Sequence, residues 1–300
     1  MSEQRDKPPI TVVKCGGNGD VDPEAVCADV AALVAEGRRV VLVHGGSAEI
    51  ERLADRLGVP QRKQTAPDGV SARHTDERTL EVVTLALAGS VKPKLVRSLV
   101  DRGVRAMGMT GLDGRLLLAR RKKAQRAVVD GRTVMVHDNL SGVVTSVNGP
   151  LLHSLLDAGM VPVISPPAIT PDGEVVNIDA DRTAAAAAAE LDADTLMLLT
   201  GAPGVQSDPA DESSVMETCT VPRSGRPPRW ARGGMALKLV AAQEALRGGA
   251  RRVLVADGRR RDPVRRALAG DATRIVLEAP DPAAGGEPRA RRPEEEAAPR

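Results

Sequence analysis

Large aromatic residues are almost absent from this 300-residue sequence, which has no Phe, no Tyr and a single Trp, Trp230. Proteins that bind single-stranded nucleic acid stack bases on aromatic side chains, so the composition argues against that function. An excess of one charge is also missing, because 42 Lys and Arg residues oppose 40 Asp and Glu residues. The resulting net charge of +2 argues against a general polyanion binder. We therefore expect no nucleic-acid partner.

Cysteines and long apolar runs are scarce as well. Cys15, Cys27 and Cys219 are odd in number and lack the spacing of metal ligands, so we expect free thiols in a reducing compartment. No apolar run approaches the roughly 20 residues that span a bilayer. The polar first residues do not resemble a signal peptide. These absences predict a cytoplasmic protein with no membrane association and no metal site of its own.

Short apolar, β-branched segments alternate with longer helical patterns along most of the chain. This alternation predicts an α/β fold, with an open, mainly parallel sheet sandwiched by helices. The expected strands cover residues 10–13, 40–43, 105–108, 161–164, 194–200, 252–256 and 273–276. The expected helices include residues 23–36, 47–57, 150–158 and 263–268, an alanine-rich helix near 182–190 and one from 233 to 247.

Residues 115–145 interrupt this pattern. Short strands at 116–119, 133–136 and 142–145 predict β-hairpins inserted into the α/β core. The basic run 120–123 lies between two of them and is interpreted either as a solvated hairpin tip or as a docking surface for an acidic partner. The polar segment 61–71 is expected to be an exposed loop over the crevice.

Glycine pairs follow the first two expected strands. Lys14-Cys15-Gly16-Gly17 ends the first, and His44-Gly45-Gly46-Ser47 ends the second, with Ser47 expected to cap the next helix. Carboxyl ends of neighbouring parallel strands meet at one sheet edge, so the bare backbone N–H groups of both loops predict one anion cradle. The alternative at each junction is an ordinary tight turn, with Lys14 in solvent.

Polar residues also gather where later helices begin. The segment 177–181 (Asn-Ile-Asp-Ala-Asp) precedes the alanine-rich helix, and 233–235 (Gly-Gly-Met) opens another, with Lys238 expected on its first turn. Arg73 stands just before a helix, where a guanidinium can grip a substrate carboxylate through two hydrogen bonds. Each feature has a plain structural alternative: an acidic helix cap, an ordinary helix start and a surface arginine.

Taken in order, these motifs resemble those of the amino acid kinase family. Lys14-x-Gly-Gly, His44-Gly-Gly, residues 177–181, a strand ending in Leu-Leu-Thr-Gly and Gly-Gly-Met-x-x-Lys238 carry the likeness. Within the family the sequence is similar to the acetylglutamate kinase branch, and most similar to the [LysW]-aminoadipate kinases. The finer likeness lies in residues 43–49, 73–81, 111–116 with 120–122, and 162–168, and the whole resemblance covers about residues 10–278.

The resemblance implies a role for each motif. Lys14 and Lys238 would contact the transferring phosphoryl group, and Asp181 would orient both lysines. Arg73 and Asn177 would hold the α-carboxylate and the amide of the amino acid. Backbone N–H groups around the phosphates and the substrate would come from Gly16, Gly17, Gly45 and Gly46. The ATP-binding residues would be Thr200, Gly201, Gly204, Gly234 and Met235.

The implied activity is an ATP- and Mg²⁺-dependent phosphorylation of a side-chain carboxylate. The substrate would be aminoadipate, or glutamate, linked to a small acidic LysW-type carrier protein, in lysine-type amino acid biosynthesis. The product would be an acyl phosphate. Carrier docking would fall to the basic residues Arg115, Arg120, Arg121, Lys122 and Lys123. Ser47 favours this branch, because acetylglutamate kinases have a third glycine there.

Two other functions remain open on the sequence. One is an N-acetylglutamate kinase of arginine biosynthesis, and the other is a non-catalytic amino-acid sensor that keeps the fold. Whichever of these functions applies, the resemblance implies a homodimer. It also implies a substrate lobe at residues 10–190 and an ATP lobe at 191–278. The start (1–9) is expected to be flexible, and the tail (279–300), which has no apolar pattern, is expected to be disordered.

Overall fold

The computed structural model describes residues 8–65, 71–129, 132–225, 228 and 230–279. Within them, one large sheet contains eight strands, in which β16 runs antiparallel to β15 and β14 runs parallel to β16. The other neighbours pair in parallel, which confirms the expected mainly parallel sheet. Its order is β14 (Thr218–Val221), β16 (Thr273–Leu277), β15 (Val253–Asp257), β13 (Thr195–Thr200), β1 (Ile10–Cys15), β2 (Arg39–His44), β10 (Val161–Ser165) and β5 (Ala106–Thr110).

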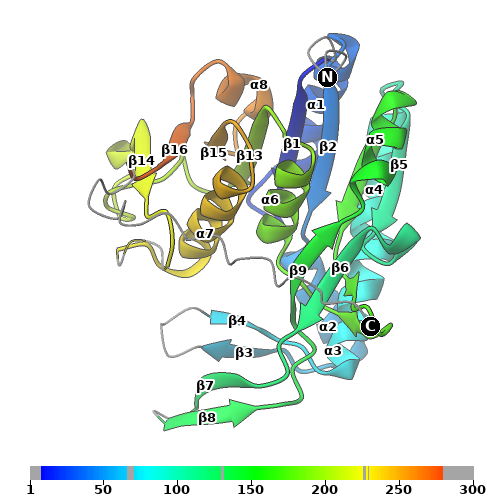
Figure 1. Ribbon diagram of the computed structural model, residues 1–300, viewed down its shortest axis with the longest axis vertical. Helices are drawn as coiled ribbons and strands as arrows, with labels where there is room; N and C mark the ends of the chain where they lie inside the picture. The colour runs from blue at the N-terminus through cyan, green and yellow to red at the C-terminus, as the bar shows by residue number, and fades with distance from the viewer. Residues whose placement is uncertain (1–7, 66–70, 130–131, 226–227, 229, 280–300) are drawn as a thin grey trace, which may run out of the picture.

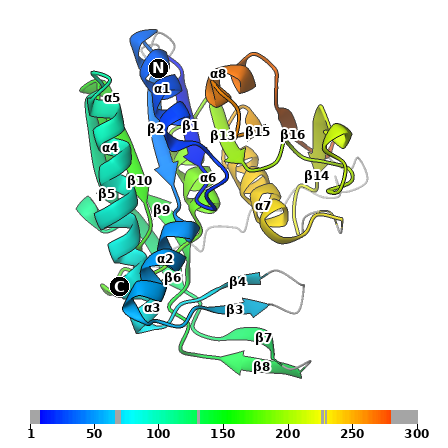
Figure 2. The same ribbon diagram turned by 180° about the vertical axis from the view of Figure 1, so that it is seen from behind.

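Helices cover both faces of this sheet, as Figures 1 and 2 show. One face carries α5 (Gly149–Asp157), α6 (Ala180–Glu190) and α7 (Gly233–Arg247), and the other carries α1 (Pro23–Ala35), α4 (Lys92–Val100) and α8 (Pro263–Leu268). The strands are therefore buried on both sides, which explains their continuous apolar character.

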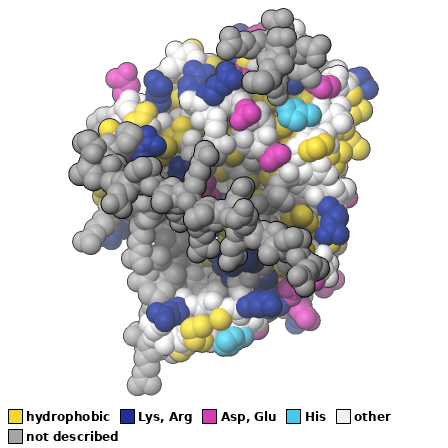
Figure 3. Space-filling model, in the orientation of Figure 1, with side chains coloured by type: hydrophobic (Ala, Val, Ile, Leu, Met, Phe, Trp, Pro, Cys, Tyr) yellow, Lys and Arg dark blue, Asp and Glu magenta, His cyan; other side chains and the backbone are white. Residues whose placement is uncertain are grey.

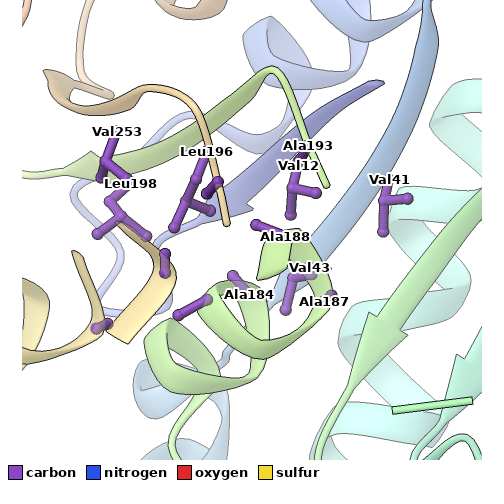
Figure 4. Close-up of a cluster of buried hydrophobic side chains, with 14 of the residues drawn as sticks. Val12, Val41, Val43, Ala184, Ala187, Ala188, Ala193, Leu196, Leu198 and Val253 are labelled. Carbon is purple, nitrogen blue, oxygen red and sulfur yellow. The ribbon is translucent and has the colours of Figure 1, made fainter. Parts of the chain in front are cut away.

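The alanine-rich helix α6 lies directly on the central strands. Ala184 and Ala188 pack against side chains of β1, β2 and β13, including Val12 and Leu196 (Figure 4). Alanine is the best helix former and its small side chain allows a close approach of helix and sheet. The amino end of α6 is consequently held against the carboxyl end of β1.

Several helices lie between β2 and β5 in the chain. They are α2 (Ser47–Leu57), then α3 (Glu77–Thr84), which continues through the π-helical turn η1 (Leu85–Val91) into α4. Asp76 caps α3 through its side chain, and Asp22 caps α1 in the same way. Ser47 is not a cap, since it is the first helical residue of α2 and Gly46 occupies the cap position.

Two small sheets form the inserted β region, which confirms the expected hairpins. One contains β4 (Ser71–His74), β3 (Arg62–Thr65), β7 (Gln125–Val129) and β8 (Arg132–Val136), and lies beyond the carboxyl ends of β1 and β2 (Figure 1). The other contains β12 (Val175–Val176), β11 (Ala168–Ile169), β6 (Leu117–Arg121) and β9 (Gly142–Val147). The remaining short elements are η2 (Asp113–Arg115) and η3 (Glu212–Ser214).

Three expectations about local structure are wrong, two of them in this β region and one in α7. The segment 61–71 is not simply a loop, because it contains β3 and the first residue of β4, and β3 also pairs with the distant β7. Residues 66–70 of that segment lie outside the described part. The basic run is not a hairpin tip, because Arg120 and Arg121 belong to β6 and pair with β9. Lys238 is the sixth residue of α7 and so lies on its second turn.

The expected lobe boundary falls between α6 and β13, and β13 pairs directly with β1 in the same sheet. The division into two lobes therefore stays a prediction, and the expected flexible start and disordered tail fall almost wholly outside the described residues. Cys15, Cys27 and Cys219 are free and buried, as expected. Among the described helices, none has the length and apolar character needed to cross a membrane.

Candidate active site

The two glycine loops meet at the carboxyl edge of the large sheet. Parallel pairing of β1 with β2 sets Lys14 beside Val43 and Cys15 beside His44. The loops continue side by side, and the backbone N–H of Ala48 donates to the carbonyl of Gly17 at 2.9 Å. The structure thus confirms that both junctions lie at one edge.

At this edge two lysines share one aspartate. Lys14 Nζ lies 2.9 Å from Asp181 Oδ1, and Lys238 Nζ lies 3.0 Å from Asp181 Oδ2. All three residues are buried, with exposures of 6%, 7% and 9% for Lys14, Asp181 and Lys238. β1 supplies Lys14, while the first turn of α6 and the second turn of α7 supply the other two.

This triad carries a surplus of positive charge. Burial opposes ionisation of Asp181, but the two ammonium groups outweigh it and lower the pKa of the carboxyl to about 2. Burial lowers the pKa of Lys238, whereas at Lys14 the attraction of Asp181 exceeds the effect of burial and raises the pKa. With both lysines protonated, two cations oppose one carboxylate. The three side chains then have a net positive charge, which favours the binding of an anionic ligand.

Asp179 lies next to the triad and caps α6, its Oδ1 accepting the Arg182 N–H at 2.9 Å. Burial, and then the nearby Asp181 charge, raise the pKa of Asp179. For the pattern 177–181 the sequence left an acidic helix cap as the structural alternative, and Asp179 is such a cap. The structure makes it the residue that holds the start of α6, and therefore Asp181, in place.

The glycines of the cradle are required by close packing of backbone. A Cβ atom on Gly17 would lie 2.3 Å from Gly46 N and 2.9 Å from Gly45 C, and a Cβ on Gly46 would lie 2.6 Å from Leu87 Cδ2. A side chain on Gly17 would therefore push the two loops apart. Glycine at these positions therefore keeps the backbone N–H groups of the two loops close together, as a shared anion site requires.

Replacing Gly17 by Ala is expected to raise the KM for the phosphate-containing substrate by about tenfold or more, because about 1.4 kcal/mol of lost binding has that effect. The matched control is Gly89→Ala, since a Cβ at Gly89 meets nothing within 4 Å. Steady-state kinetics on both variants measures the effect. Equal KM values for the two would contradict a ligand role for the cradle.

The two residues expected to hold the amino acid lie on the side of the small sheets. Arg73, on β4, hydrogen-bonds through its guanidinium to Gln61 Oε1 and lies 3.5 Å from Glu51 Oε1. Asn177 Nδ2 donates to Thr75 Oγ1 at 3.1 Å. Thr75 Oγ1 in turn lies 3.5 Å from the carbonyl of Arg73, so the structure brings the pair together around Thr75.

The residues expected to bind ATP lie at the other end of the edge. Thr200 ends β13, and Gly234 and Met235 lie in the first turn of α7. Gly201 approaches Asp20 so closely that a Cβ on Gly201 would lie 2.4 Å from Asp20 Cβ. Gly204 packs against β16, where a Cβ would lie 2.7 Å from Thr273 Oγ1. Packing alone accounts for Gly204, and its contact with a nucleotide stays a prediction.

The basic residues expected to dock a carrier do not form one patch. Arg121 pairs with Glu174, and Arg115 donates to the carbonyl of Pro171. Lys122 is half-buried, and burial, followed by the positive charge of Arg182, lowers its pKa. Arg120 and Lys123 are exposed. Because part of the basic run is paired in β6, its side chains lie in different environments, some paired or half-buried and others exposed.

Surface charge is similarly divided elsewhere. In the view of Figure 3, Lys and Arg side chains lie in separate small patches among other residues, not on one continuous basic face. This distribution fits the nearly balanced composition of the chain.

Two buried polar residues at this edge have no predicted role. Burial lowers the pKa of His44 to about 4, so its ring is neutral at pH 7, and its Nε2 has no hydrogen-bond partner in the described structure. Burial lowers the pKa of Lys92 to about 8, and no ion pair of Lys92 is formed among the described residues. No sequence pattern distinguishes Lys92 from a surface lysine of a helix.

Glycine loops, two converging ammonium groups and a mainly parallel sheet together define a phosphotransferase of the α/β class. Among solved structures, carbamate kinase from Giardia lamblia bound to AMP-PNP matches 90% of this chain and 99% of its own, with a TM-score of 0.63 and 15% identity. An N-acetylglutamate synthase from Neisseria gonorrhoeae matches 92% of this chain and 61% of its own, with a TM-score of 0.70 and 24% identity. These likenesses support the fold.

Sequence comparison identifies the family. The family model described as "Amino acid kinase family" matches residues 9–257, and the chain belongs to that family. It is 42% identical to the [LysW]-aminoadipate kinase of Thermus thermophilus over 88% of this chain and 99% of the relative. The [LysW]-aminoadipate kinase of Deinococcus radiodurans is 39% identical, covering 88% and 90%. An acetylglutamate kinase of Methanocella arvoryzae is 37% identical, covering 70% of each chain.

Proposed function

We propose that this protein transfers the γ-phosphoryl group of ATP to the side-chain carboxylate of aminoadipate held by a small LysW-type carrier protein. The observation that carries the proposal is the convergence of Lys14 and Lys238 on the buried Asp181 beside the glycine cradle. The 42% identity to a [LysW]-aminoadipate kinase over nearly the whole relative supports the substrate class. N-acetylglutamate is the alternative substrate, supported by similarity to acetylglutamate kinases.

The chemistry needs positioning and positive charge. An oxygen of the acceptor carboxylate forms a bond to the γ-phosphorus while the bond from that phosphorus to the bridging oxygen of ADP breaks. The acceptor is already ionised at neutral pH, since the ordinary pKa of such a carboxyl is about 4.3, so no general base is required. Lys14 and Lys238 would stabilise the negative charge on the transferring group, and Asp181 would keep both ammonium groups in place.

The cradle fits the phosphates of ATP, because backbone N–H groups and surplus positive charge lie together and a Cβ on Gly17 would fill the space between the loops. Mg²⁺ commonly binds through substrate phosphates with few protein ligands. Among the described residues no cluster of three or more His, Cys, Asp or Glu side chains is placed to hold a metal. Mg²⁺ would thus enter with ATP and neutralise phosphate charge.

Hydroxylamine trapping of the acyl phosphate tests the proposal, with carrier-linked aminoadipate, N-acetylaminoadipate and N-acetylglutamate offered in parallel. We expect turnover of the carrier-linked acid to exceed that of both free acids. Efficient turnover of N-acetylglutamate alone would favour the arginine-type alternative. Amino-acid binding without acyl phosphate from any substrate would favour a sensor.

Docking of the carrier is tested by charge reversal of Arg120 and Lys123, two exposed residues of the basic run. Arg120→Glu with Lys123→Glu is expected to raise the KM for an acidic carrier by about tenfold at low salt, with a smaller effect at high salt, because exposed charges are screened. Arg247→Glu with Arg274→Glu is the control, since these exposed residues lie on α7 and β16. Equal effects of the two double variants would rule out a specific dock at the basic run.

A homodimer is also proposed. β5 is an edge strand of the large sheet and carries the exposed Met107, while the neighbouring η1 and α4 carry the exposed Leu85 and Val100. An unpaired edge with nearby apolar side chains favours association. Sedimentation velocity of the wild type and of Met107→Lys measures it, and a wild type that sediments as a monomer would contradict the proposal.

A further inference from the structure

Arg73 and Asn177 come from separate parts of the chain. Arg73 lies on β4, in the small sheet that contains β3, β7 and β8, whereas Asn177 follows β12 of the other small sheet. If both hold one amino acid, as proposed above, their relative position decides how well the substrate fits. A device that fixes one sheet relative to the other is therefore needed.

The backbone of the segment 139–142, which follows β8 and ends at the first residue of β9, connects the two residues. Leu140 N–H donates to the carbonyl of Thr75 at 2.7 Å, and Asn177 N–H donates to the carbonyl of Leu140 at 2.8 Å. Gly142 N–H then donates to the carbonyl of Asn177 at 2.8 Å. Leu140 thus links the backbone of Thr75, two residues after Arg73, to the backbone of Asn177.

Asn139 holds this segment in place through its side chain. Its Oδ1 accepts the Thr75 N–H at 3.2 Å, and its Nδ2 donates to Gln64 Oε1 at 2.8 Å. The residue is 2% exposed, so water cannot replace these bonds freely. A carboxamide is well suited here, because it offers an acceptor and a donor on adjacent atoms.

We propose that Asn139 is a positioning residue for the amino-acid substrate, which acts by locking the segment 139–142 to Thr75 and so fixing Arg73 relative to Asn177. The roles of Arg73 and Asn177 rest on the proposed function. The linkage between them rests on three hydrogen bonds among Thr75, Leu140 and Asn177 and on the hydrogen bond from Thr75 Oγ1 to the carbonyl of Arg73. Asn139 itself makes no contact with the lysine–aspartate triad in the described structure.

The test compares Asn139→Leu with Asn148→Leu. Asn148 is a matched control, because its Oδ1 also accepts a backbone N–H, from Leu151, and its Nδ2 donates to the carbonyl of Gly114, outside the substrate site. Asn139→Leu is expected to raise the KM for the acceptor by about tenfold or more, since a lost buried hydrogen bond has an effect of that order. The KM for ATP should stay within about twofold, and Asn148→Leu should change neither KM.

Amide hydrogen exchange adds a readout that is independent of activity. Asn139→Leu should speed exchange in the peptides that contain Thr75 and Asn177, because both amides belong to the linked contacts, while Asn148→Leu should not. Unchanged exchange at Asn177, or an unchanged acceptor KM in a folded variant, would overturn the inference. If Asn139→Leu does not fold, Asn139→Asp, which keeps the acceptor for Thr75 N–H, is expected to show the same effects at smaller size.

The two proposals fail in different ways. A wild type that phosphorylates none of the three acids would contradict the proposed function, and the exchange measurement would still decide whether Asn139 links the two segments. If N-acetylglutamate proves to be the acceptor, its KM serves in place of that of the carrier-linked acid, because its carboxylate and amide present the same groups to Arg73 and Asn177.

Discussion

Replacing Lys14 by Met is expected to lower kcat by about 10³-fold or more, because it removes one of two cations that stabilise the transferring phosphoryl group in a water-poor site. Lys14 Nζ is buried and lies 2.9 Å from Asp181 Oδ1. Met fills a similar volume but leaves Asp181 opposed by Lys238 alone, so the surplus positive charge of the triad disappears. Hydroxylamine-trapped product formation at saturating substrate measures kcat.

Lys92→Met is the matched control, since Lys92 is equally buried, at 6% exposed, and no ion pair of Lys92 is formed in the described structure. It should keep kcat and gain thermal stability. The pKa of Lys92 is about 8 when folded, below the ordinary lysine value, so burying its charge opposes folding most below pH 8. The gain in Tm should therefore be largest below pH 8 and shrink as the pH approaches 10. A kcat loss shared by both variants would contradict a specific role for Lys14.

Asp181→Asn is expected to lower kcat by about 10²- to 10³-fold, because the amide keeps the shape but no longer anchors two ammonium groups. The Asp181 charge favours the protonated form of both lysines: it outweighs burial at Lys14, whose pKa is raised, and offsets part of the effect of burial at Lys238, whose pKa is lowered. Without its charge, Lys14 and Lys238 lose protons at lower pH. The alkaline limb of the kcat profile should consequently move to lower pH, which a rate–pH series measures.

The same substitution should destabilise the fold by about 3 kcal/mol near neutral pH, since it leaves buried cations without a counter-ion. The pKa of Asp181 is about 2 when folded, so its stabilising contribution is present above the ordinary aspartate range and is lost as the pH falls toward 2. The stability difference between variant and wild type should shrink over that range.

Asp29→Asn provides the control for Asp181→Asn. Asp29 is buried and accepts the backbone N–H groups of Val264 and Arg265 at 2.7 and 3.0 Å, where α8 begins. Its substitution should lower stability without moving the pH profile of kcat. A similar shift of the profile in both variants would show that the effect is not specific to the triad.

Local patterns in the sequence determined the class of fold and the elements that carry the chemistry. Apolar runs predicted β1, β2 and β13, because strands buried on both faces are apolar along most of their length. Glycine pairs after Lys14 and His44 marked the cradle, and the alanine run marked α6. These features depend on neighbours in the chain, so a sequence shows them directly.

Only the tertiary structure decided how distant segments combine. The strands β3 and β4 and the pairing of β3 with β7 were not evident, although the expected strand 133–136 coincides with β8. Polar strands have no apolar alternation, and the pairing joins residues far apart in sequence. The same holds for the run around Arg120, whose side chains diverge once β6 pairs with β9. Asn139 and Lys92 carry no local signal at all. Their surroundings arise from packing between elements, which periodicity along the chain does not encode.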